Sequence, residues 1–222
     1  WSPEEIVDAE LVGVLSFKTI YSWIHRGFLA VTEKVLRRKG KKPSTQEKRG
    51  RFNVKKTIKD RPQEVENRKT FGHWELDTMV SSRGQSKGCL ATFVERKTRF
   101  YVAIKMDDRT KDSMFLAISS LYNTLTSKLL KTFTVDRGKE FACFEQVENK
   151  FGIPMYFADA YAAWQRGSNE NSNGLLREFF PKKTDLAKVT LDKLTEALVL
   201  INNRPRKYLG LKTPFDMFKH EI

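Results

Sequence analysis

The sequence predicts an α/β protein built around a mixed β-sheet with helices on both faces. Three apolar segments between residues 73 and 106 show the alternation of hairpin-linked β-strands. Two more short apolar segments follow, at 132–136 and 154–158, and amphipathic helical segments separate and follow them. The chain has 222 residues, of which 40% are hydrophobic, so it is long enough for one mid-sized domain with a small appendage.

The first three strands are expected at 73–80, 89–95 and 100–106. Turn-forming residues fill 81–88, and a short turn at 96–99 joins the second strand to the third. Both connections are too short for a crossover between parallel strands, so these strands are predicted to form an antiparallel meander.

The rest of the chain alternates between helix and strand and then ends in helices. Helices are expected at 112–128, 140–151, 168–180 and 191–202, around buried strands at 132–136 and 154–158. Three strands followed by helix, strand, helix, strand and two helices is the element order of the ribonuclease-H-like fold.

Residues 1–32 are predicted to form two short helices. Ser2 is the expected cap of the first helix, with Glu5 completing a capping box, and Ser16 is the expected cap of the second. Lys18 and Arg26 lie on the predicted outer face of the second helix, which suits half of a helix-turn-helix DNA reader. A generic helical hairpin is the alternative. Because the chain begins at Trp1 and these helices are too few for a core, we expect a fragment that lacks upstream sequence.

The net charge of +14 predicts a polyanionic partner. Residues 33–61 contain 13 Lys or Arg residues and only 3 Asp or Glu residues, so 33–70 is interpreted as a basic linker that follows a nucleic-acid backbone. The linker has no apolar helical face and no segment is long enough to span a bilayer, so no membrane role is expected. Cys89 and Cys143 form no CxxC pair, which argues against a disulfide scaffold or a cysteine zinc site and favours a reducing cytoplasm.

Three acidic residues occupy positions suited to metal chemistry. Asp77 lies within the first predicted strand, Asp136 ends a buried strand, and Glu170 lies near a helix start, 34 residues after Asp136. Carboxylate oxygens suit Mg²⁺ or Mn²⁺, and ligands bind at the carboxyl ends of such strands. Each residue also has a purely structural interpretation: an edge-strand charge, a turn residue and a partner of the helix dipole. Glu75, on the same strand face as Asp77, and Asp159 are reserve ligands.

Several motifs around these carboxylates resemble the IS-thirty family of bacterial insertion-sequence transposases, within the Asp-Asp-Glu superfamily that includes retroviral integrases. The resemblance covers nearly the whole chain. It is carried by Phe71-Gly-His-Trp-Glu-Leu-Asp77-Thr78, Asp136-Arg-Gly-Lys-Glu140-Phe141, Tyr156-Phe-Ala-Asp159, Trp164-Gln-Arg-Gly-Ser-Asn-Glu170-Asn-Ser-Asn-Gly174-Leu-Leu-Arg177 and Asn202-Asn-Arg-Pro205.

The resemblance implies that 71–222 is an integrase-type catalytic domain in which Asp77, Asp136 and Glu170 bind two Mg²⁺ or Mn²⁺ ions. Water then nicks DNA at a transposon end, and the freed 3′-hydroxyl attacks target DNA. The expected partners are terminal inverted repeats, target DNA and at least a second copy of the chain, and the expected location is the bacterial cytoplasm, on the nucleoid. Candidate DNA contacts are Arg177, Lys139, Arg166, Asn173, Lys18 and Arg26, and the asparagines near Glu170, including Asn169, are expected to be exposed.

Three other interpretations stay open at this point. Another ribonuclease-H-like nuclease would share the carboxylates and differ in substrate. A DNA-binding regulator, or an inactive relic on the same scaffold, would bind DNA without cutting it. A structural domain with no nucleic-acid role is hardest to reconcile with the charge of +14.

Overall fold

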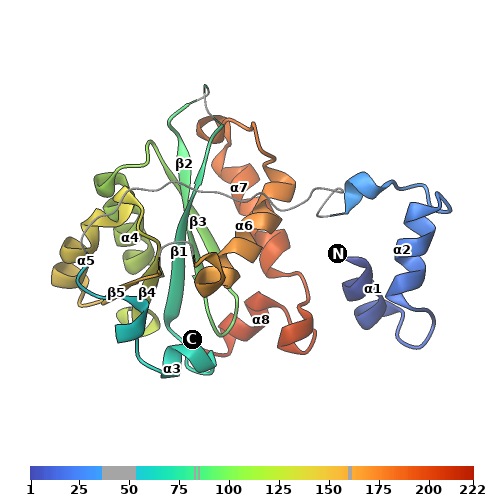
Figure 1. Ribbon diagram of the computed structural model, residues 1–222, viewed down its shortest axis with the longest axis horizontal. Helices are drawn as coiled ribbons and strands as arrows, with labels where there is room; N and C mark the ends of the chain where they lie inside the picture. Colours follow the sequence, from blue (N-terminus) through green and yellow to red (C-terminus); the bar gives the residue numbers. More distant parts are fainter. Residues whose placement is uncertain (37–53, 83, 85, 160–161) are drawn as a thin grey trace.

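The computed structural model describes residues 1–36, 54–82, 84, 86–159 and 162–222, and these form a five-stranded mixed sheet flanked by helices (Figure 1). The strand order is β3-β2-β1-β4-β5. The strands are β1 (His73–Val80), β2 (Cys89–Glu95), β3 (Tyr101–Met106), β4 (Thr132–Val135) and β5 (Met155–Phe157). The three hairpin-linked strands are antiparallel, whereas β4 and β5 run parallel to β1. The predicted mixed sheet is therefore confirmed.

Helices cover both faces of this sheet (Figure 1). The helices of the sheet domain are α3 (Glu64–Asn67), α4 (Lys111–Thr124), α5 (Phe144–Phe151), α6 (Gly167–Phe179), α7 (Leu191–Asn202) and α8 (Pro214–Lys219). Apolar residues of α4 and α5 share one buried cluster, and those of α6 and α7 share another. The site described below lies on the α6 side of β1.

Strand β2 shows why the sheet needs two covering layers. All seven of its residues are buried, and successive side chains alternate between the two clusters. Ala91 and Phe93 join the α4–α5 cluster, whereas Leu90 and Val94 join the α6–α7 cluster. A strand buried on both faces is a nearly continuous apolar segment, and 89–95 has that character.

The helix predicted at 112–128 ends earlier, at Thr124, because Leu125 adopts an extended conformation. The helix predicted at 140–151 begins as a 3₁₀ turn, Lys139–Cys143, before α5. The sequence prediction missed the short helices α3 and α8. Elements of four to six residues carry too little periodicity to be found by pattern.

The basic linker predicted at 33–70 does not extend through 54–70. Thr57 forms a bridge to Phe157 at the edge of the sheet, Val65 is fully buried, and the buried Arg61 donates to the hydroxyl of Thr134 at 3.0 Å. The many basic residues of this segment led to the prediction of a linker. Several of them instead pack against the sheet domain or pair with its carboxylates. The centre of the predicted linker, 37–53, lies outside the described residues.

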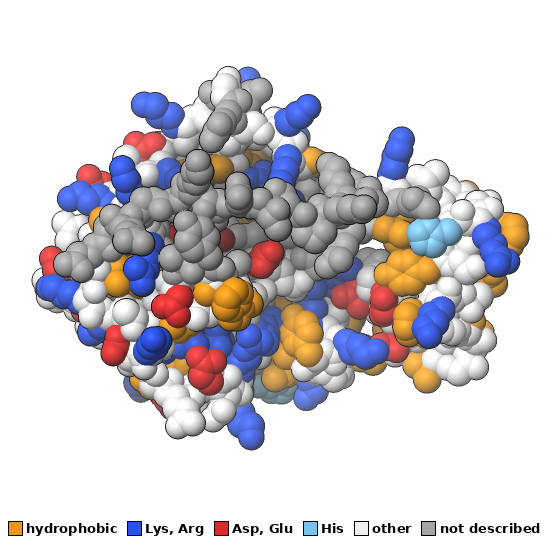
Figure 2. Space-filling model, viewed as in Figure 1, with side chains coloured by type: hydrophobic (Ala, Val, Ile, Leu, Met, Phe, Trp, Pro, Cys, Tyr) orange, Lys and Arg blue, Asp and Glu red, His pale blue; other side chains and the backbone are white. Residues whose placement is uncertain are grey.

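The N-terminal helix α1 (Pro3–Glu10) contacts the C-terminal part of the chain, and α2 (Phe17–His25) packs against α1 (Figure 1). The capping box on Ser2 is confirmed, and Ser16 caps α2 as expected. Glu5 pairs with Arg204 at 2.6 Å, and Asp8 pairs with Lys207 at 3.1 Å. Figure 2 shows acidic and basic side chains side by side at this junction. The assignment of this segment as half of a helix-turn-helix stays a prediction.

We expect the buried His73 to make stability depend on pH. Burial lowers its pKa below the ordinary value of 6.5, while Glu64, 3.4 Å away, opposes the shift and the positive charges of Lys131, Arg96 and Arg61 reinforce it. Below pH 6.5, His73 binds a proton in the unfolded chain but stays neutral in the folded protein until the pH reaches its lower folded-state pKa. Above about pH 6.5, His73 therefore does not reduce the free energy of unfolding. Below that pH, the free energy of unfolding falls until the pH reaches the lower pKa that His73 has in the folded state.

Urea unfolding at several pH values between 5 and 8 measures this effect. His73→Asn should flatten the fall relative to the unmodified protein. Equal pH dependence of the two proteins would contradict the prediction.

Among the described residues, no helix combines the length and the apolar character needed to span a membrane.

Candidate active site

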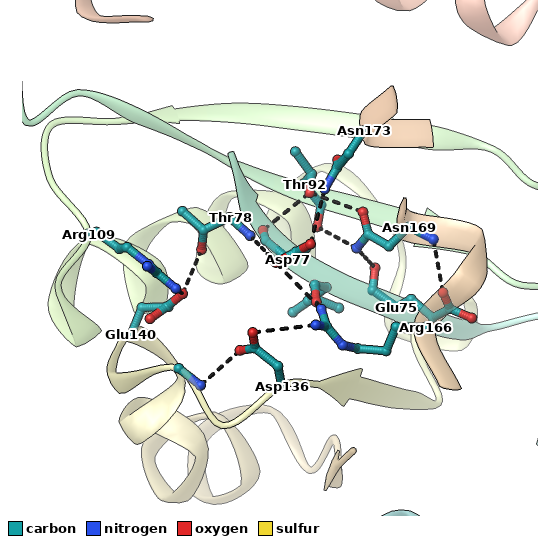
Figure 3. Close-up of polar contacts among 12 residues, drawn as sticks. Glu75, Asp77, Thr78, Thr92, Arg109, Asp136, Glu140, Arg166, Asn169 and Asn173 are labelled. Carbon is teal, nitrogen blue, oxygen red and sulfur yellow. Dashed lines mark hydrogen bonds and ion pairs between the residues drawn. The ribbon is translucent and has the colours of Figure 1, made fainter. Parts of the chain in front are cut away.

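The pairing of β1 with β4 brings two acidic residues together. The parallel register sets Glu75 opposite Thr134, so Asp77 and Asp136, each two residues further on, lie level at the carboxyl end of the sheet. Asp77 points to the α6 face of β1, and Asp136 follows directly after β4 (Figure 3). The sequence analysis placed Asp136 at the end of a buried strand and Asp77 within a strand, and this register sets the two side by side.

Each carboxylate is held by hydrogen bonds to its own surroundings (Figure 3). Asp77 accepts from the backbone N–H of Thr78 at 2.8 Å and from the amide of Asn173 at 3.1 Å. Asp136 accepts from the backbone N–H of Gly138 at 2.8 Å. Asn173 is itself positioned by the Tyr101 hydroxyl, which donates to its amide oxygen at 2.7 Å. Asn173, predicted as a DNA contact, therefore bonds to Asp77.

The guanidinium of Arg166 lies between the two aspartates. Its Nη1 is 3.5 Å from Asp77 Oδ1, and its Nη2 is 3.4 Å from Asp136 Oδ2. Burial raises the pKa of Asp77 above its ordinary value, Arg166 opposes that rise, and the charge of Asp136 adds to it. Two carboxylates that share one guanidinium form a site that favours a positive charge between them.

Glu140 is a further carboxylate beside the pair and is itself buried, and the sequence analysis gave it no role. Its Oε1 accepts from the Thr78 hydroxyl at 3.1 Å and from Nε of Arg109 at 2.7 Å (Figure 3). Gly138 makes room for it, because a Cβ at that position would lie 2.5 Å from Glu140 Oε2. The Asp136-Arg-Gly-Lys-Glu140 sequence was the available signal, since an acidic residue in a tight turn after a buried strand needs a partner.

A buried network anchors the start of α6 to β1. Glu75 is fully buried and pairs with Arg96. The backbone N–H of Asn169 donates to Glu75 Oε2 at 3.0 Å, and its side-chain amide donates to the Glu75 carbonyl at 2.9 Å. The expectation that Asn169 is exposed is therefore wrong: it is fully buried because its amide satisfies backbone groups of the sheet. Glu75, the reserve ligand, is committed to this network.

Glu170 occupies the next position, in the first turn of α6, and its side chain is exposed. Within the described part of the chain, no three His, Cys, Asp or Glu side chains are close enough to share one metal ion. The structure thus brings Asp77 and Asp136 together and leaves Glu170 outside their contacts.

The other predicted DNA contacts are spread more widely. Arg177 donates to the carbonyl of Val80 at 2.7 Å, at the end of β1. Lys139 is exposed three residues after Asp136, whereas Lys18 on α2 and Arg26 at the C-cap of α2 are exposed away from the aspartates. Trp164, two residues before Arg166, is 74% exposed and presents an aromatic surface near the site.

Comparison with known proteins identifies the family. Residues 67–163 match the integrase core domain family. The chain is 37% identical over 187 residues to the transposase InsI of insertion sequence IS30A from Escherichia coli K12, covering 83% of this chain and 48% of that protein. It is 36% identical over its whole length to the transposase of IS4351 from Bacteroides fragilis, covering 70% of that protein. The chain belongs to the IS30 family of insertion-sequence transposases. It spans about half the length of the E. coli relatives that it matches.

Solved structures give the same fold for this IS30-family chain. The catalytic core of BIV integrase superposes with a TM-score of 0.54 at 19% identity, covering 68% of this chain and 96% of that core. The HTLV-2 integrase core, solved in complex with magnesium, superposes with a TM-score of 0.51 at 17% identity, covering 66% of this chain and 95% of that core. At these identities the likeness establishes the fold.

The aspartate pair fits a divalent cation. Asp77 and Asp136 offer hard oxygen donors, and the place between them already accommodates the positive charge of Arg166. Mg²⁺ commonly takes one or two protein carboxylates and fills its other positions with water and substrate phosphates. Two convergent aspartates therefore suffice for a first ion without a third contact from Glu170.

Proposed function

We propose that this chain carries the catalytic centre of a metal-dependent DNA transposase, which cuts DNA at the ends of an insertion sequence and joins them to target DNA. The observation that carries the proposal is the pairing of Asp77 with Asp136 at the carboxyl end of the sheet, on a chain of net charge +14. Membership of the IS30 family supports DNA as the substrate, and the two carboxylates support metal-dependent chemistry.

Asp77, Asp136 and Glu170 are the proposed metal ligands, with two Mg²⁺ or Mn²⁺ ions as the proposed complement. Bound there, the ions supply Lewis-acid activation of the attacking oxygen and stabilise the charge of the leaving oxygen. Asp77 and Asp136 are pre-organised by the bonds from Thr78, Asn173 and Gly138. That rigidity lowers the cost of assembling the site.

Glu170 is proposed as the third ligand because the anchor beside it fixes its position. Asn169 binds the β1 backbone and the Glu75 carboxylate, so the first turn of α6 cannot move without breaking buried hydrogen bonds. The backbone of Glu170 is thus held beside the anchored Asn169, and its exposed carboxylate is accessible to DNA-bound ions. Arg177 stands two helical turns further along α6 and is proposed to bind a phosphate beside the site.

The proposed partners are terminal inverted repeats, target DNA and at least a second copy of the chain. Lys139 is exposed three residues after Asp136, which supports a proposed contact with the DNA strand being cut. The exposed Trp164 is proposed to stack on an unpaired base. Lys18 and Arg26 would bind DNA outside the catalytic centre.

A cleavage and joining assay tests this function. A labelled duplex carrying the element's terminal repeat is incubated with the protein and a supercoiled plasmid, in Mg²⁺, Mn²⁺ or EDTA. We expect nicked duplex and duplex joined to plasmid with either metal, and neither product in EDTA. Cleavage without joining would favour a nuclease of the same fold, and DNA binding without products would favour a regulator or relic.

We expect Lys18 and Arg26 to contribute to DNA affinity through phosphate contacts. Replacing both with Gln should reduce the slope of log K against log salt concentration by about 2, since each contact adds about 0.9. Fluorescence anisotropy across a salt series measures this slope.

Lys128→Gln with Lys131→Gln is the matched control. This pair also removes two exposed positive charges, but it lies at the amino end of β4, away from Asp136. If both double variants changed the slope equally, the effect would come from the overall positive charge of the protein. A specific role for Lys18 and Arg26 would then be refuted.

A further inference from the structure

Arg166 makes a contact that differs from the other contacts of the two aspartates. It belongs to the 3₁₀ turn Ala163–Arg166, directly before α6, and its side chain is 12% exposed. Its two Nη atoms reach different carboxylates at 3.5 and 3.4 Å, longer than the 2.7–2.9 Å of tight charge-assisted hydrogen bonds. Its buried Nε has no hydrogen-bond partner among the described residues. The guanidinium therefore offsets part of the negative charge of the two aspartates, with loose geometry.

The aspartates do not depend on Arg166 for their positions. Asp77 is held by Thr78 and Asn173, and Asp136 is held by the Gly138 backbone, at 2.8–3.1 Å. These bonds use carboxylate oxygens and donors that remain if the guanidinium leaves. Displacing Arg166 would cost one carbonyl hydrogen bond, at 3.3 Å to Leu76, and two loose ion pairs.

We propose that Arg166 is a built-in counter-ion that occupies the cation position between Asp77 and Asp136 and competes with divalent metal for it. This inference rests on the proposed function, because that function supplies the metal. A guanidinium and a divalent ion repel each other and cannot both lie between the same two carboxylates. Arg166 offsets one of the two negative charges of the metal-free site and weakens its affinity for free ions. The released guanidinium then lies at the carboxyl end of the sheet, where a DNA phosphate is to be bound.

Mn²⁺ binding without DNA tests the competition. Free Mn²⁺ is measured by electron paramagnetic resonance during titration of the unmodified protein, Arg166→Gln and Arg137→Gln. Arg137 is the matched control, because it neighbours Asp136 in sequence but its Nε donates to the Ala158 carbonyl at 3.3 Å. We expect Arg166→Gln to bind Mn²⁺ about tenfold more tightly than the unmodified protein, and Arg137→Gln to change affinity by less than about threefold, since only Arg166 occupies the site.

Equal or weaker Mn²⁺ binding by Arg166→Gln would overturn the inference, as would an equal gain in Arg137→Gln. Circular dichroism checks folding, and Arg166→Lys, which keeps the charge but cannot span both carboxylates, should bind Mn²⁺ with intermediate affinity. Failure of the proposed function has a different signature. In that case, neither the unmodified protein nor the Arg166→Gln variant would bind Mn²⁺, or both would bind it and adding Asp136→Asn would change the affinity of neither.

Discussion

Asp136→Asn is expected to abolish DNA cleavage and strand transfer while leaving DNA binding intact. The substitution removes one of the two charges that would hold the metal, yet Asn has the same shape and its oxygen still accepts from the Gly138 N–H. We expect a loss of at least about 10³-fold in the rate of cleavage, equivalent to about 4 kcal/mol of activation free energy. Single-turnover cleavage of the labelled duplex in Mg²⁺ measures the rate, and anisotropy measures binding.

Asp107→Asn is the control for this experiment. Asp107 is exposed in the turn after β3, so its substitution changes the net charge equally without touching the aspartate pair. It should cleave at close to the unmodified rate. If Asp136→Asn also cleaved at that rate, the assignment of the catalytic carboxylates would be wrong.

Arg96→Met produces the largest loss of stability that the structure predicts. Its guanidinium pairs with Glu75, and the two side chains are only 3% and 0% exposed. Arg96 Nε also donates to the Val65 carbonyl at 3.2 Å, which ties the segment before β1 to the sheet. Removing Arg96 leaves a fully buried, uncompensated carboxylate, which costs about 3–5 kcal/mol of the free energy of unfolding. Urea denaturation measures the loss.

Two comparisons make that result specific. Lys97→Met removes the same charge one residue away, but Lys97 is 28% exposed in its pair with Glu221, so it should cost no more than about 1 kcal/mol. Adding Glu75→Gln to Arg96→Met removes the stranded charge and should restore part of the loss. A double variant less stable than Arg96→Met would contradict the buried-charge explanation.

Local sequence signals predicted the parts of the fold that depend on neighbouring residues. The bounds of β1 and β2 and the Ser2 capping box follow from alternation and capping chemistry within a few positions. Asp136 was identifiable because it directly follows a buried strand. These features need no knowledge of partners distant in the chain.

Partners that meet only in the folded chain could not be predicted in this way. Glu75 and Arg96 are 21 residues apart, and the Arg166 contacts join a 3₁₀ turn to β1 and to the residue that follows β4. Asn169 was assigned to the surface because polar residues usually are, whereas its burial follows from backbone groups that no sequence pattern displays. The topology of the fold brings these groups together, and the residues next to each of them in the sequence do not indicate its partner.

In the proposed function, Asp77, Asp136 and Glu170 together hold the catalytic metal. Anomalous diffraction from crystals of the protein with Mn²⁺ and a terminal-repeat duplex tests it most directly. We predict a Mn²⁺ peak coordinated by Asp77 and Asp136, Glu170 coordinating an ion at the same centre, and the Arg166 guanidinium moved out from between the aspartates. Mn²⁺ bound elsewhere on the protein, with Arg166 still bridging Asp77 and Asp136 in the DNA complex, would contradict the account.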